Sequence, residues 1–122
     1  MLFRSGERVW IGHNIGFDIA ILRREAKLAG IAWSDPLALD TMCLYMALRP
    51  RAADVELEAI AADLGVDVIG RHTALGDALV AAEIWRRLLP LLAEAGIRTL
   101  GEALDYAERP SKIRRLQRAL GW

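Results

Sequence analysis

Apolar residues recur along most of the chain at intervals of three and four positions, which indicates amphipathic helices. An exception is the continuous apolar run at residues 9–11, which predicts a short buried strand ending at Gly12. The helical pattern then covers residues 15–29, so we expect a helix with Asn14 as its N-cap and Gly30 as its stop. The expected core face of this helix consists of Ile15, Ile19, Leu22, Ala26 and Ala29.

Polar caps and helix stops indicate five further helical segments along the rest of the chain. They are expected from about 41 to 48 after Asp40 or Thr41, from about 55 to 64 after Asp54, from about 74 to 95 with a kink or restart at Pro90, after the capping box Thr99-Leu-Gly-Glu102, and after Ser111. A single strand does not make a stable sheet. The pattern therefore predicts that strand partners are missing from these residues.

The composition is that of one small domain with a packed core, because 54% of the 122 residues are apolar. No apolar run approaches the roughly 18 residues needed to span a bilayer, so we expect no membrane contact, and no secretory leader is visible. The single cysteine, Cys43, is expected as a buried thiol on an apolar helix, in a reducing, cytoplasmic compartment. The formal net charge is zero, so nucleic-acid binding would need a local basic cluster.

Two similar motifs carry the candidate chemistry. Residues 13–18 read His-Asn-Ile-Gly-Phe-Asp at the end of the expected strand, and residues 72–77 read His-Thr-Ala-Leu-Gly-Asp at the start of the longest helix. Asp18 and Asp77 fall on apolar helix faces, where an ionised carboxylate is costly unless it is paired or bound to a metal. Taken singly, each acid is also explained by the helix dipole, and His72 by a loop or capping role. Two such motifs in one chain favour a shared site.

The motifs resemble those of the DEDDh 3′-5′ exonucleases, the family of the proofreading epsilon subunit of bacterial DNA polymerase III. His-Asn-x-x-Phe-Asp at residues 13–18 is similar to the second motif of that family, and His-x-Ala-x-x-Asp at residues 72–77 is similar to the third. Leu-Asp-Thr at residues 39–41 also matches, so the resemblance covers about residues 9–92. It implies an α/β fold of the ribonuclease H-like type and hydrolysis of DNA or RNA from the 3′ end, with release of nucleoside monophosphates.

The resemblance also implies roles for individual residues. Asp18 and Asp77 would help to hold two Mg²⁺ or Mn²⁺ ions, which prefer carboxylate oxygens and stabilise the attacking and leaving oxygens of an in-line displacement. His72 would act as the general base. Three residues of the second motif would contact the nucleic acid: His13, Asn14 and Phe17.

One family motif is not found. The first motif, Asp-x-Glu on the first strand, has no counterpart upstream of His13, where Glu7 is the only acid. We therefore expect an incomplete sheet, weak metal binding and little activity from these 122 residues alone. A shortened chain, a reading frame that begins late and a degenerate homologue all fit this absence. Residues 1–98 would then be the C-terminal portion of an exonuclease domain, and residues 99–122 a helical extension.

Two other interpretations stay open. The missing acids favour a non-catalytic nucleic-acid-binding or assembly module, which would use the sheet-facing surface. The basic segment at residues 112–118 favours a helical DNA-binding domain, although such charge patterns usually form a solvated helix face. Four tryptophans offer stacking platforms for bases: Trp10, Trp33, Trp85 and Trp122. For Trp10 and Trp85, packing in the core is the better interpretation. Uncovered apolar faces and open strand edges predict self-association.

Overall fold

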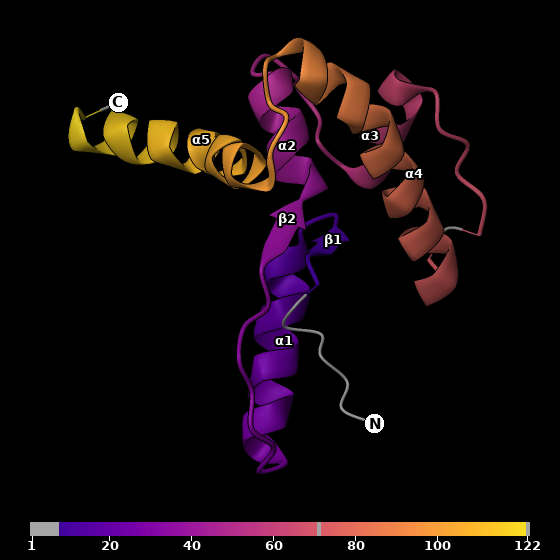
Figure 1. The fold of residues 1–122 in the computed structure, drawn as a ribbon, viewed down its shortest axis with the longest axis vertical. Helices are drawn as coiled ribbons and strands as arrows, with labels where there is room; N and C mark the ends of the chain where they lie inside the picture. The colour runs from indigo at the N-terminus through magenta and orange to yellow at the C-terminus, as the bar shows by residue number, and fades with distance from the viewer. Residues whose placement is uncertain (1–7, 71, 122) are drawn as a thin grey trace.

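The computed structural model describes residues 8–70 and 72–121, so Glu7, Arg71 and Trp122 lie outside the described residues. Its elements, in chain order, are β1 (Trp10–Gly12), α1 (Ile15–Leu28), β2 (Ala38–Asp40), α2 (Thr41–Leu48), α3 (Leu57–Leu64), α4 (Ala74–Glu94) and α5 (Leu100–Ala119). Figure 1 shows the two strands at the centre, with α1 and α2 extending from them in opposite directions. Helices α3 and α4 lie on one side, and α5 projects on the other. The fold is therefore α/β and mostly helical, as expected.

The described sheet has two parallel strands, in which Trp10 pairs with Ala38 and Gly12 with Asp40. Helix α1 makes the crossover connection between them. The expectation of one strand was wrong, because β2 is only three residues long and shows no alternation of its own. Its parallel pairing with β1, a tertiary contact, makes the segment a strand, and its central residue, Leu39, is buried in the core.

The core lies where β2, α2, α3, α4 and the first turns of α5 meet. Helices α3 and α4 each bury one apolar face in this core. The buried residues are Leu57, Ile60 and Ala61 on α3, and include Ala81, Ile84 and Leu88 on α4. Two polar contacts fix the helices around this core. The Tyr45 hydroxyl donates to Asp63 Oδ2 at 2.7 Å, and Thr99 forms the expected capping box with Glu102. Within the described residues, no helix is long and apolar enough to cross a membrane.

Two helices differ from the expectation. In α1, Ile19 and Ala26 are buried, but Leu22 is 42% exposed, because the helix packs against only a two-stranded sheet. In α5, the helix continues through Pro110 instead of restarting at Ser111. A proline inside a helix removes one backbone hydrogen bond, here the one to the carbonyl of residue 106, and the remaining bonds carry α5 to Ala119.

Candidate active site

A cavity of about 500 Å³ opens where β1 ends and where α1 and α4 begin. Asp18, from the first turn of α1, and Asp77, from the first turn of α4, both line it although 59 positions separate them in the sequence (77 − 18). His13, which follows β1, lies on the same wall. Glu56, at the N-cap of α3, is a third acid on the lining. Since His13 is the only basic side chain among the described lining residues, the cavity favours cations.

Asp40 fixes the turn from which Asp18 projects. Its Oδ1 atom accepts the backbone N–H of Asn14 at 2.8 Å and the backbone N–H of Met42 at 2.9 Å. One carboxylate oxygen therefore caps α2 and holds the turn between β1 and α1. Asn14 precedes α1 as expected, but it has a left-handed backbone with φ 54° and its side chain makes no capping hydrogen bond. Asn14 is therefore the N-cap by position, as expected, without the side-chain hydrogen bond that usually accompanies an asparagine cap.

The loop before α4 is folded tightly against the helix start. The backbone N–H of His72 donates to Asp77 Oδ1 at 3.1 Å, which ties the two motif residues together. Thr73 Oγ1 donates to the Gly70 carbonyl at 2.6 Å and accepts the Gly76 backbone N–H at 3.0 Å. A Cβ at position 76 would lie 1.9 Å from the Gly70 carbonyl oxygen, so the packing requires glycine there.

The motif residues differ in their exposure and in whether they line the cavity. Asp18 is exposed and Asp77 is half-buried, so the expectation that Asp18 lies on a buried face was wrong: the face of α1 that carries it is open to the cavity. His72 is exposed and adjoins Asp77 without lining the cavity. Asn14 and Phe17 do not line the cavity either, and Phe17 is 62% exposed.

Glu56 was not identified from the sequence. It belongs to neither motif, and its only local signal is an acid next to a helix start, which the helix dipole already explains. Its approach to the other two acids depends on how α3 packs against α4, which is a tertiary contact.

The carboxylates of Asp18, Glu56 and Asp77 are suitable ligands for a hard divalent cation, because such ions bind carboxylate oxygens. Among the described residues, however, no three side chains of His, Cys, Asp or Glu lie close enough together to hold a metal ion. Mg²⁺ is bound by about six ligands in octahedral geometry. The described side chains would therefore supply only part of a metal site.

Comparison with known proteins identifies the family. A family model described as exonuclease, of the RNase T group, matches residues 3–85, which is more than half of the chain. The chain belongs to the exonuclease family. The match agrees with a DEDDh-type exonuclease and with a ribonuclease H-like fold, of which the two-stranded sheet is an incomplete version. Exonucleases act on nucleic acids, and those of this kind typically use divalent metal ions.

Similar proteins include much longer chains. A DNA polymerase III subunit epsilon-like protein of Rhodobacter capsulatus is 36% identical over 109 residues, covering 88% of this exonuclease chain and 15% of the relative. A Mycobacterium tuberculosis protein, named as a bifunctional exonuclease/endonuclease, is 32% identical over 95% of this chain and 18% of its own length. A PolC-type DNA polymerase III of Caldanaerobacter subterraneus is 31% identical over 77% of this chain, which is 7% of the length of the relative. The chain thus spans less than a fifth of each relative. No solved structure matches it.

Proposed function

We propose that this chain is part of a 3′-5′ exonuclease module that hydrolyses phosphodiester bonds of DNA or RNA from the 3′ end. One observation carries the proposal: Asp18 and Asp77 line the same cavity despite their distance in the sequence. Each acid lies in the first turn of a helix, and the starts of both helices line one cavity together with Gly12, the last residue of β1. Ligand sites in α/β proteins commonly lie at this end of the strands.

In the proposed mechanism, the side chains have different roles. Asp18 and Asp77 would hold Mg²⁺ or Mn²⁺, which would supply charge stabilisation for the reacting oxygens. His72 would accept a proton from the attacking water, because it is exposed and is held next to Asp77 by its backbone. His13 would contact the terminal nucleotide from the cavity wall, and Phe17 has the exposure needed to stack on a base.

A non-catalytic assembly module is the second candidate. In the described residues, β1 pairs only with β2. Beside β1 lies a mostly apolar cavity of about 350 Å³, whose lining includes Ile11, Trp85 and Leu89. An unpaired strand edge next to apolar side chains favours binding of a further strand, from a partner or from a second copy.

We also propose that residues 1–98 form the C-terminal portion of the exonuclease domain and that residues 99–122 form a helical extension. The family match to residues 3–85 lies within the first of these two parts. The start of this extension is anchored, since Ala103 is buried in the core. We place the module in the cytoplasm, where the thiol of Cys43 stays reduced.

Restoring the missing motif tests the proposal. A strand segment that carries Asp-x-Glu, designed on the first motif of the DEDDh family, would be fused upstream of residue 8. Release of labelled nucleoside monophosphates from 3′-labelled single-stranded DNA would then be measured with Mg²⁺. We expect far faster release from the fusion than from the unfused chain. Within the fusion, His72→Ala should slow release by about 10²- to 10⁴-fold, the usual range for a general base.

Asp67→Asn in the same fusion is the matched control, because Asp67 is an exposed acid that does not line the cavity. Its activity should be unchanged. A folded fusion that binds DNA 3′ ends without cleaving them would instead support the non-catalytic module. Rapid Mg²⁺-dependent cleavage by the unfused chain would show that the first motif is unnecessary.

A further inference from the structure

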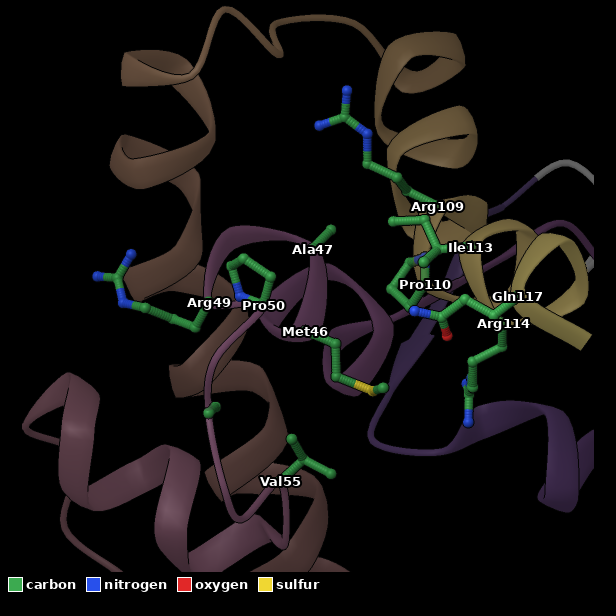
Figure 2. A pocket seen from close by; sticks show the side chains of 11 residues that line it. Met46, Ala47, Arg49, Pro50, Val55, Arg109, Pro110, Ile113, Arg114 and Gln117 are labelled. Atoms are coloured by element: carbon green, nitrogen blue, oxygen red, sulfur yellow. The ribbon is translucent and has the colours of Figure 1, made fainter. Parts of the chain in front are cut away.

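A groove of about 390 Å³ lies between the end of α2, the loop after it and the middle of α5. It shares no lining residue with the candidate active site. The apolar side chains that line it include Met46, Val55 and Ile113. Three basic residues also line the groove. Figure 2 shows Arg109 and Arg114 on its border, on α5, and Arg49 at the end of α2 with its side chain directed away from the apolar centre.

The groove concentrates positive charge in a chain that has no net charge. Among the described residues that line it, none is acidic. Arg49 lies 3.8 Å from an oxygen of Asp63, but Arg109 and Arg114 make no ion pair within the described part of the chain. Residues 109–118 carry five basic side chains and no acidic one. Two arginines are therefore available to a carboxylate from outside.

The lining is held in place before any ligand binds. The Tyr106 hydroxyl donates to the Ala47 carbonyl at 3.2 Å, which fixes α5 against α2. The Arg109 guanidinium carbon lies 5.3 Å from the centroid of the Tyr106 ring, a cation–π contact that limits where this arginine can go. A site fixed in this way loses less conformational entropy on binding.

We propose that this groove binds an acidic peptide segment of a partner protein, with carboxylates on Arg109 and Arg114 and an aliphatic side chain on the apolar floor. Arginine binds carboxylates through two parallel hydrogen bonds, which gives geometric specificity. The aliphatic floor needs an apolar group that a phosphate chain does not offer. Single-stranded nucleic acids usually stack on aromatic side chains, and no described lining residue is aromatic. A peptide with both acidic and aliphatic side chains matches both halves of the groove.

Fluorescence anisotropy with the full 122-residue chain tests the proposal. The probes are a fluorescein-labelled peptide of glutamates with leucines at helical spacing, the same peptide with serine in place of each leucine, and labelled oligothymidylate. The glutamate–leucine peptide should bind most tightly. Arg114→Glu, and separately Arg109→Glu, should weaken it by roughly tenfold or more, as expected for loss of a charge-assisted pair. Ile113→Ser should also weaken it.

Two neighbouring substitutions on α5 are the matched controls. Arg115→Glu makes the same charge change and Leu116→Ser the same loss of apolar surface, and neither residue lines the groove. Both should leave the affinity nearly unchanged, with unfolding midpoints confirming that all variants fold. Equal binding of the serine peptide, equal effects of Arg114→Glu and Arg115→Glu, or tighter binding of oligothymidylate through Arg109 and Arg114 would overturn the proposal.

Discussion

Replacement of Asp40 by alanine tests how the turn that carries Asp18 is held. The change removes two hydrogen bonds to one carboxylate oxygen, from Asn14 at 2.8 Å and from Met42 at 2.9 Å. Loss of the helix cap costs about 1 kcal/mol. The second bond, from Asn14, joins segments 26 residues apart and ends on a charged group. Its loss costs about 1.5 kcal/mol, the low end of the range for hydrogen bonds to charged groups, because Asp40 is only half-buried. We therefore expect the free energy of unfolding to fall by about 2.5 kcal/mol.

Urea unfolding followed by circular dichroism measures this loss, and the melting temperature should fall by about 10 °C for a chain of this size. Asp54→Ala is the matched control, since Asp54 Oδ1 accepts only the local N–H of Glu56, at 2.9 Å, among the residues that the structure describes. That variant should lose about 1 kcal/mol or less. Asp40→Asn keeps an acceptor oxygen, so its loss of stability should lie between the losses of Asp40→Ala and Asp54→Ala. Equal losses for Asp40→Ala and Asp54→Ala would refute the bridging role of Asp40.

Three further predictions concern packing, titration and assembly. Gly76→Ala should destabilise the chain strongly because its Cβ meets the Gly70 backbone, whereas Gly16→Ala, with open space around it, should be neutral or stabilising by up to about 1 kcal/mol; urea unfolding compares the two. Burial, helped by the Asp40 charge, raises the pKa of the Cys43 thiol to about 11, so stability should fall as pH rises from about 9 toward 11, and native alkylation at pH 8.5 should be slow; alkylation as fast as in the unfolded chain would contradict this. Light scattering across a concentration series should show self-association. Leu89→Lys, in the apolar cavity beside β1, should reduce this association more than Leu79→Lys, which lies outside that cavity. A monomer at every concentration would contradict the argument from the open edge of β1.

The sequence predicted most helices because their signals are local. Caps and periodic apolar residues located α2 and α4 closely, and Thr99 and Glu102 located the start of α5. The apolar pattern also found α3, but the expected cap Asp54 was wrong, because the N-cap of α3 is Glu56. It missed β2, whose only support is its pairing with β1 and the burial of Leu39. It also ended a helix at Pro110, because proline is a strong breaker signal, although one lost backbone bond did not end α5.

The candidate site was predicted in part. The two His-to-Asp motifs indicated which acids to compare, and the cavity includes both Asp18 and Asp77. Local patterns placed Asp18 on a buried face, because they do not show that the sheet beneath α1 is narrow. They could not find Glu56 or the bridging role of Asp40, since both depend on contacts between segments distant in the sequence. The catalytic roles themselves stay predictions.

Manganese titration of the ¹⁵N-labelled chain, followed by NMR, tests most directly whether Asp18 and Asp77 belong to one site. Mn²⁺ bound in the cavity broadens nearby amide signals. Resonances of residues 12–18 and 74–78 should broaden together at the same Mn²⁺ concentration, and Asp77→Asn should protect the Asp18 signal, while the control Asp67→Asn should not. Broadening of the two segments at different concentrations, or an Asp18 signal that is unaffected by Asp77→Asn, would contradict a shared site.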